Sequence, residues 1–270
     1  MTSMQMTADR PAADLAGFDR TEYDINGVHA VVLSIGSGPP LVFLHGTGTF
    51  TGFEAARGWA KHRRVIIPYH PGFGDSGDAP GLEDIGDYVL HYMDLFDALG
   101  LDGFDLVGFS LGGWISAEYA VRQPQRLRRL VLIAPIGLVV DGAPAPDLFQ
   151  IAPPELPAFL AHDPTRILHH FPNAPDPAFE ARMGREIGGL AKLIGDQPQG
   201  NPRLARWLHR IRLPTLVLWG AEDRLRPTAQ SEAWRALLPD GDVKLVPATG
   251  HLVLEETPAA ADLVADFLTR

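Results

Sequence analysis

A strand, a sharp turn and a helix are predicted by Leu106-Val107-Gly108-Phe109-Ser110-Leu111-Gly112-Gly113. Apolar strand formers lead into a serine that glycines flank in the spacing G-x-S-x-G, and a helical pattern continues over 114–121. In such a turn the incoming strand and the outgoing helix leave little room for Cβ atoms beside the serine. The pattern is typical of a nucleophile elbow, which lifts a serine hydroxyl to the edge of a sheet. Ser110 is therefore our candidate nucleophile.

The composition indicates one globular α/β domain with an insertion. The chain has 270 residues, of which 46% are hydrophobic, and its formal net charge is −10. An acidic surface repels phosphate backbones, so we expect no nucleic-acid partner. There is no cysteine, which excludes disulfides, a thiolate nucleophile and cysteine-ligated metals.

The chain shows no sign of membrane insertion or export. No run approaches 18 apolar residues, and residues 1–16 lack the apolar segment of a signal peptide. We therefore expect no membrane partner and a cytoplasmic enzyme. The sequence does not specify an oligomeric state.

Buried-strand patterns alternate with helical patterns along most of the chain. A hairpin is predicted at 25–35, strands at 41–44, 65–69, 104–107, 130–134, 216–219 and 243–246, and helices at 53–62, 85–99, 114–121, 228–238 and 259–268. This alternation predicts a mostly parallel sheet flanked by helices.

The alternation stops after residue 137, where prolines become frequent and helical fragments remain at 157–162 and 178–193. It resumes with the strand at 216–219. We therefore predict a flexible N-terminal tail over 1–20, a core formed by 21–137 and 205–270, and a helical cap (lid) over 138–204. The cap should cover the carboxyl ends of the strands, where open α/β sheets place their sites.

A serine nucleophile needs a base to take its proton and an acid to orient that base. His251 follows a strand and a glycine, so we expect it at the same sheet edge as Ser110. Asp223 follows the strand at 216–219 and is the expected acid, although an aspartate there can also cap a helix. Asp141 is the rival acid, and Glu222 is expected to point elsewhere.

Two amide N–H groups should form the oxyanion hole. Leu111 follows the nucleophile and supplies one, and Thr47, between two glycines after the strand at 41–44, supplies the other. We interpret His45 as a structural residue that fixes this loop. Pro71-Gly72-Phe73-Gly74 is interpreted as turn chemistry and not as a phosphate cradle, because no helix opens from it at the required spacing.

Taken in chain order, these motifs make the sequence resemble the α/β-hydrolase superfamily, specifically its capped serine esterase and carbon–carbon hydrolase-like branch. The resemblance rests on Leu44-His45-Gly46, residues 71–76, residues 108–114, residues 220–223 with Pro227, and Gly250-His251. It implies an α/β-hydrolase fold with a mostly parallel eight-stranded sheet and a helical cap inserted after strand 6. It also implies the triad Ser110–His251–Asp223, with no cofactor and no metal.

The resemblance also bears on the reaction. The branch with an aspartate nucleophile is excluded because position 110 is serine. Meta-cleavage product hydrolases often carry Ser-Gly-Pro-Gly after His-Gly, where this chain has Thr47-Gly48-Thr49-Phe50. This departure argues against their activity.

We therefore expect a serine hydrolase that cleaves a small to medium hydrophobic ester or lactone through an acyl-enzyme. The alternatives are a carbon–carbon hydrolase or perhydrolase that uses the same triad, and a non-catalytic small-molecule receptor. Apolar residues in or near the cap are the expected lining of the substrate pocket: Phe109, Ile136, Phe149, Phe159, Phe171 and Leu252, with Leu156, Leu168 and Met183 as further candidates.

Overall fold

The computed structural model of the chain describes residues 15–49, 53–195 and 197–269. Eight strands form one sheet in the order β1-β2-β4-β3-β5-β6-β7-β8. The β1–β2 and β2–β4 pairs are antiparallel, and the other pairs are parallel. The predicted α/β-hydrolase fold, with a mostly parallel eight-stranded sheet, is confirmed.

The strands are β1 Asp19–Ile25, β2 Val28–Ile35, β3 Pro40–Leu44, β4 Arg64–Pro68, β5 Phe104–Phe109, β6 Leu127–Ile133, β7 Thr215–Gly220 and β8 Gly241–Val246. The α-helices are α1 Glu54–Trp59, α2 Ile85–Ala98, α3 Leu111–Arg122, α4 Leu156–Leu160, α5 Pro177–Ile194, α6 Ala229–Leu237, α7 Val253–Glu256 and α8 Ala260–Thr269. No helix within the described ranges is both long and apolar enough to span a bilayer.

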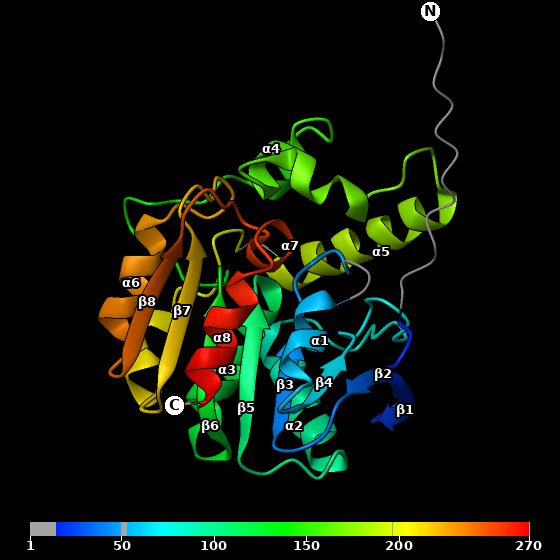
Figure 1. Ribbon diagram of the computed structural model, residues 1–270, viewed down its shortest axis with the longest axis vertical. Helices are drawn as coiled ribbons and strands as arrows, with labels where there is room; N and C mark the ends of the chain where they lie inside the picture. The colour runs from blue at the N-terminus through cyan, green and yellow to red at the C-terminus, as the bar shows by residue number, and fades with distance from the viewer. Residues whose placement is uncertain (1–14, 50–52, 196, 270) are drawn as a thin grey trace, which may run out of the picture.

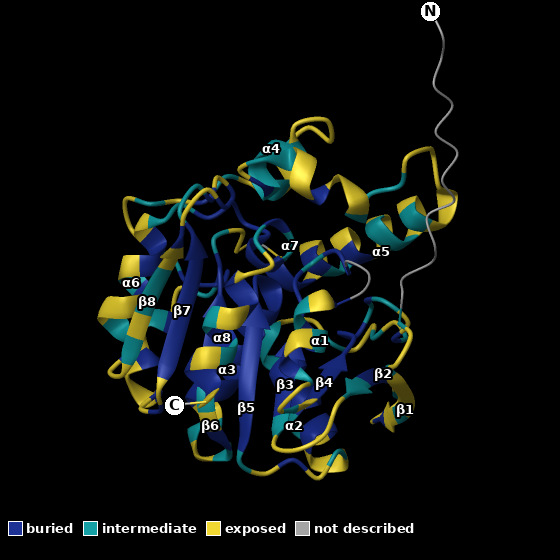
Figure 2. Ribbon diagram, viewed as in Figure 1, coloured by how far each residue is buried: buried dark blue, intermediate teal, exposed yellow. Residues whose placement is uncertain are grey.

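The core lies between the sheet and the helices on its two faces. Helices α1 and α8 pack together on one face, where Trp59 Nε1 donates to Ala261 O at 3.0 Å, and α2 and α3 pack together on the other (Figure 1). Every residue of β5 and β7 is buried, as Figure 2 shows. Central parallel strands are covered on both faces, which explains their continuous apolar runs.

The N-terminal hairpin begins earlier than expected. Its turn at Asn26-Gly27 is as predicted, and both residues have positive φ, as a tight hairpin turn requires. Asp19 and Arg20, which fell inside the expected tail, already belong to β1. Phe18 also packs edge-on against Phe53. The sequence obscured this strand because its residues alternate little in polarity and are mostly exposed. Residues 1–14 of the expected tail lie outside the described residues.

The segment between β6 and β7 contains α4 and α5, with short 3₁₀ turns at Leu148–Gln150, Pro164–His170, Leu204–Arg206 and Leu208–Arg210. Helices α4 and α5 lie beyond the carboxyl ends of the parallel strands (Figure 1). Both helical fragments expected within the cap are present, and α5 starts with Asp176 accepting hydrogen bonds from the amides of Ala178 and Phe179.

A buried histidine on α2 makes stability depend on pH. Burial lowers the pKa of His91 to about 4. Unfolded histidine titrates near pH 6.5, so the unfolded state binds the proton first as the pH falls, and the free energy of unfolding decreases between about pH 6.5 and 4. His91→Leu should reduce the loss between pH 7.5 and pH 5 by about 2 kcal/mol in urea unfolding. The exposed His62 provides the control His62→Leu, which should retain the full loss; an equal loss in all three proteins would contradict the prediction.

Candidate active site

Ser110 occupies a strained backbone turn between β5 and α3. Its φ of 51° and ψ of −111° lie outside the regions that ordinary residues adopt. A Cβ on Gly108 would lie 2.4 Å from Gly112 O, and a Cβ on Gly112 would lie 2.1 Å from Leu44 O. Glycine is therefore required at both positions for steric reasons, as the elbow motif predicts.

The structure brings Ser110, His251 and Asp223 together from three separate loops. The Ser110 Oγ lies 3.0 Å from His251 Nε2, and His251 Nδ1 lies 2.9 Å from Asp223 Oδ2. The imidazole and the Asp223 carboxylate are almost completely shielded from solvent. This line of hydrogen bonds can carry a proton from the hydroxyl to the imidazole and stabilise the resulting imidazolium.

Asp223 accepts hydrogen bonds both from the imidazole of His251 and from backbone amides of its own loop. Its Oδ1 accepts hydrogen bonds from the amides of Leu225 and Arg226 at 2.9 and 2.7 Å, which leaves Oδ2 for His251. These bonds hold a bend and not a helix, because α6 begins at Ala229 with Thr228 at its N-cap, so the helix-capping role considered for Asp223 is wrong. The rival Asp141 is exposed on the segment after β6.

Two glutamates that sequence reasoning did not assign hold the loop of His251. Glu222 Oε2 accepts a hydrogen bond from the Thr249 amide at 2.9 Å. Glu256 Oε2 accepts from the Gly250 amide at 2.7 Å, and the same carboxylate accepts from the amides of His162 and Asp163 in the inserted segment. Glutamates within five residues of a candidate catalytic residue are common, so the sequence alone gave no reason to select these two.

The loop expected to form the oxyanion hole lies against the nucleophile. The Gly112 amide donates to His45 O at 3.0 Å, and a Cβ on Gly46 would lie 3.2 Å from Ser110 Cβ. Leu111 is the first residue of α3, and first-turn amides have no acceptor within their own helix. The Leu111 and Thr47 amides therefore remain our candidates for the oxyanion hole.

A buried chain of hydrogen bonds fixes the backbone before Thr47. The Tyr92 hydroxyl donates to His70 Nδ1, and His70 Nε2 donates to His45 O at 2.7 Å. His45 Nε2 accepts from the His70 amide, so His45 Nδ1 donates to Gly46 O at 2.7 Å. Burial lowers the pKa of both histidines, which keeps the rings neutral. This arrangement is consistent with the structural role expected of His45.

A cavity of about 40 Å³ lies against Gly46 and Phe109, which adjoin the nucleophile, although Ser110 itself does not line it. Its apolar walls are Phe43, Phe53, Phe109 and Leu254. Polar groups also reach it, among them His170 from the inserted segment and Glu255, whose pKa burial raises to about 7. Such a wall favours a mostly apolar group next to the reacting carbonyl.

Of the expected pocket residues, the structure places only Phe109 on this cavity. Ile136 and Leu252 are buried, and Phe159 and Phe171 are half-buried. The side chain of Phe149 is 40% exposed and that of Leu168 is 53% exposed, so these two do not belong to a closed pocket in this structure. Hydrophobic pattern alone could not distinguish a wall of the site from the outside of the cap, because both faces carry apolar residues.

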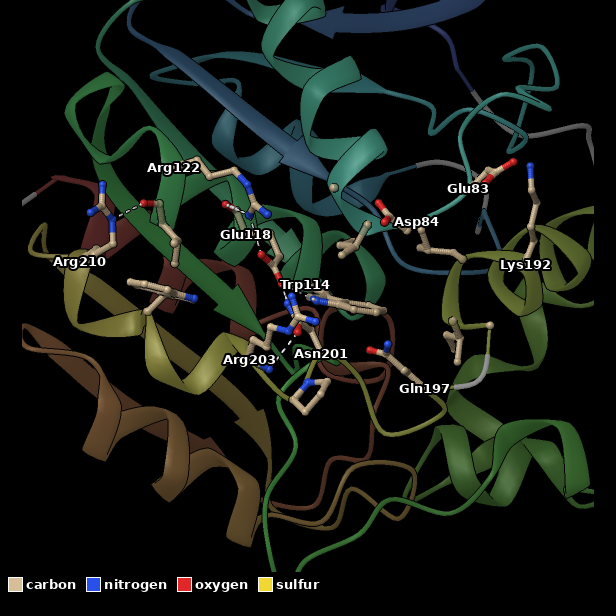
Figure 3. A pocket seen from close by; sticks show the side chains of 18 residues that line it. Glu83, Asp84, Trp114, Glu118, Arg122, Lys192, Gln197, Asn201, Arg203 and Arg210 are labelled. Atoms are coloured by element: carbon tan, nitrogen blue, oxygen red, sulfur yellow. Dashed lines mark hydrogen bonds and ion pairs between the residues drawn. The ribbon is translucent and has the colours of Figure 1, made fainter.

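A larger cavity, of about 850 Å³, lies away from Ser110, against the outer side of α3 (Figure 3). At its centre the buried Glu118 carboxylate accepts hydrogen bonds from Trp114, Asn201 and Arg122. These bonds tie the end of the inserted segment to α3. In the described part of the chain, no three metal-ligating side chains gather closely enough to hold an ion.

Comparison with known proteins identifies relatives over most of the chain. The model of the Alpha/beta hydrolase family matches residues 41–265. A 2-hydroxy-6-oxo-2,4-heptadienoate hydrolase of Pseudomonas putida is 30% identical, over 90% of this chain and 93% of that protein. A 2-hydroxymuconate semialdehyde hydrolase of Pseudomonas putida is 32% identical, over 86% of this chain and 88% of that protein.

Solved structures show a similar architecture. The crystal structure of a bacterial membrane phospholipase A has a TM-score of 0.78 and 26% sequence identity, and the match covers 94% of this chain and 86% of that one. The shared architecture therefore includes the inserted segment as well as the sheet.

The site geometry predicts selective reaction of one serine with a fluorophosphonate. Ser110 should be labelled, Ser110→Ala should not, and Asp223→Asn should label at least about 100-fold more slowly because the imidazole loses its orienting carboxylate. The measurement is the rate of adduct formation by intact-protein mass spectrometry. Ser231→Ala, which alters a buried serine on α6, should react like the parent protein. Equal labelling of Ser110→Ala would contradict the assignment of the nucleophile.

Proposed function

The chain belongs to the Alpha/beta hydrolase family, and on that basis we propose that it is a serine hydrolase that cleaves a carbon–carbon bond in 2-hydroxy-6-oxodienoates. The observation that carries the proposal is the Ser110–His251–Asp223 line of hydrogen bonds in a chain whose curated relatives include hydrolases of such compounds. The relatives favour this alternative over the hydrolysis of a hydrophobic ester or lactone, which the apolar residues of the cap led us to expect.

The reaction uses the three side chains in fixed roles. His251 Nε2 accepts the Ser110 proton while Oγ attacks the C6 carbonyl carbon, and the amides of Leu111 and Thr47 stabilise the oxyanion. Collapse of the tetrahedral intermediate breaks the C5–C6 bond and leaves the acyl group on Ser110. Water, deprotonated by His251, then releases the acyl group as a carboxylic acid.

The leaving group distinguishes this reaction from ester hydrolysis. When the 2-hydroxydiene has tautomerised to its 2-oxo form, with a proton added at C5, the electron pair released at C5 is delocalised through the remaining double bond to the 2-oxo group. A proton from the His251 imidazolium then completes the leaving group. An ester releases an alkoxide to the same imidazolium, so the triad serves both reactions.

A cation on α5 suits the carboxylate that these substrates carry. Arg182 lies one helical turn before Glu186, which contacts the oxyanion loop, so the two share a helix face. Within the described ranges, the buried Arg182 Nε has no hydrogen-bond partner. Its charge also lowers the pKa of the neighbouring Tyr69, against the larger effect of burial. We therefore assign the substrate carboxylate to Arg182, since guanidinium groups bind carboxylates through two parallel hydrogen bonds.

Ester hydrolysis remains the second candidate because the cavity beside Ser110 is largely apolar and the phospholipase A structure is similar. The two functions are separated by comparing kcat/KM for 2-hydroxy-6-oxo-2,4-heptadienoate with kcat/KM for p-nitrophenyl butyrate. We expect the dienoate value to be at least about 100-fold higher, corresponding to roughly 3 kcal/mol of transition-state stabilisation. A preference for the ester would overturn the proposal in favour of the second candidate.

Arg182→Gln should separate the two substrates further. Loss of a charged hydrogen-bond partner should lower kcat/KM for the dienoate by about 10- to 100-fold and for the neutral ester by less than about threefold. The matched control is Arg185→Gln on the same helix, because Arg185 donates to the backbone carbonyls of Gly74 and Ser76. Equal losses on both substrates would show that Arg182 does not recognise a carboxylate.

A further inference from the structure

Glu186 is a fully buried carboxylate on α5 that faces the oxyanion loop. Its Oε2 accepts a hydrogen bond from the Thr49 amide at 2.7 Å, and its Oε1 accepts from Thr49 Oγ1 at 2.8 Å and from the Gly74 amide at 3.0 Å. No lysine or arginine of the described ranges forms an ion pair with it within 4.0 Å. A buried carboxylate without a cation depends on such donors for its stability.

Thr49 lies two residues beyond Thr47, the candidate oxyanion donor. The preceding end of this short loop is fixed, because His45 O accepts from the Gly112 amide of the elbow. The following end is held at Thr49 by Glu186. Between these points Gly46 and Gly48 impose little conformational preference of their own. The direction of the Thr47 N–H therefore depends on both attachments.

We propose that Glu186 is a positioning residue that orients the Thr47 amide toward the oxyanion from the inserted segment. This inference rests on the proposed acyl transfer at Ser110. It assigns α5 a role besides covering the substrate: the helix completes the oxyanion hole. The reaction then reaches its full rate only when Glu186 contacts Thr49.

Other residues of α5 attach the helix to the core without touching the oxyanion loop. Arg185 donates to Gly74 O and Ser76 O, and Lys192 donates to Pro80 O. These side chains account for docking of the helix on the loop after β4. Glu186 differs from them because two of its three bonds go to Thr49. The two roles can therefore be separated by substitution.

Glu186→Gln replaces one carboxylate oxygen with an NH₂ group, which donates hydrogen bonds and does not accept them. The single remaining oxygen therefore cannot accept from both the Thr49 amide and the Gly74 amide, which bond to different oxygens of Glu186. We expect kcat for the best substrate to fall by about 10- to 100-fold while KM changes by less than about threefold, because the oxyanion forms only after binding. The rate of phosphonylation of Ser110 should fall by a similar factor, since the phosphoryl oxygen occupies the same hole.

Arg185→Met is the matched control for docking of α5, and it should change kcat by less than about threefold. A second pair of variants changes Thr49 and leaves the carboxylate in place. Thr49→Val, which lacks the hydroxyl donor, should lower kcat by about 2- to 10-fold, and Thr49→Ser should restore it. This pair gives the test if Glu186→Gln does not fold.

The inference is overturned if Glu186→Gln and Arg185→Met lose kcat equally, or if Glu186→Gln changes KM alone. If Glu186→Gln does not fold, the inference is overturned when Thr49→Val has the same kcat as the parent protein. Failure of the proposed function has a different signature: the parent protein would neither turn over dienoate or ester nor be phosphonylated at Ser110. A parent protein that reacts normally and a Glu186→Gln variant that matches it would reject only the role of Glu186.

Discussion

The strained backbone at Ser110 is the constraint on which the site depends. A non-glycine residue at φ 51° and ψ −111° costs on the order of 1–3 kcal/mol, so the surroundings must hold it in place. Ser110 N donates to Ile133 O of β6, and Ser110 O accepts from the amides of Trp114 and Ile136. The buried sheet and α3 thus enforce a turn that the serine would not adopt alone.

Two buried carboxylates, those of Glu256 and Glu186, and the half-buried carboxylate of Glu222 hold the loops around this turn. Glu222, Glu256 and Glu186 each accept hydrogen bonds from backbone amides that lie outside regular helices and strands. A buried amide needs an acceptor, and an ionised carboxylate provides a stronger one than a carbonyl. Glu256 and Glu186 also join the inserted segment to the core, so the groups that position His251 and the oxyanion loop are the groups that seat the cap.

The same triad geometry serves more than one reaction, and what distinguishes the reactions is the substrate-binding part of the inserted segment. Ester and carbon–carbon cleavage share the attack on a carbonyl carbon, the oxyanion and the acyl-serine. They differ in the leaving group and in the residue that binds the substrate on the leaving-group side. We propose that the anchor in this protein is Arg182 on α5, which shares a helix face with Glu186. The two proposals together put substrate choice and transition-state stabilisation on neighbouring turns of one helix.

The sheet, the elbow and the identity of the three aligned side chains could all be predicted from the sequence. Each has a local cause: apolar runs make central strands, glycines permit the turn, and strands that end at one edge bring Ser110, Asp223 and His251 together. The tail boundary and the pocket lining were predicted less well, as Asp19 and Phe149 show. Only the tertiary structure decided that Glu186 reaches Thr49, 137 residues away in the chain, and that Arg182 lies on the same face. Such contacts depend on how an irregular, proline-rich insertion packs against the core, and no local periodicity encodes that packing.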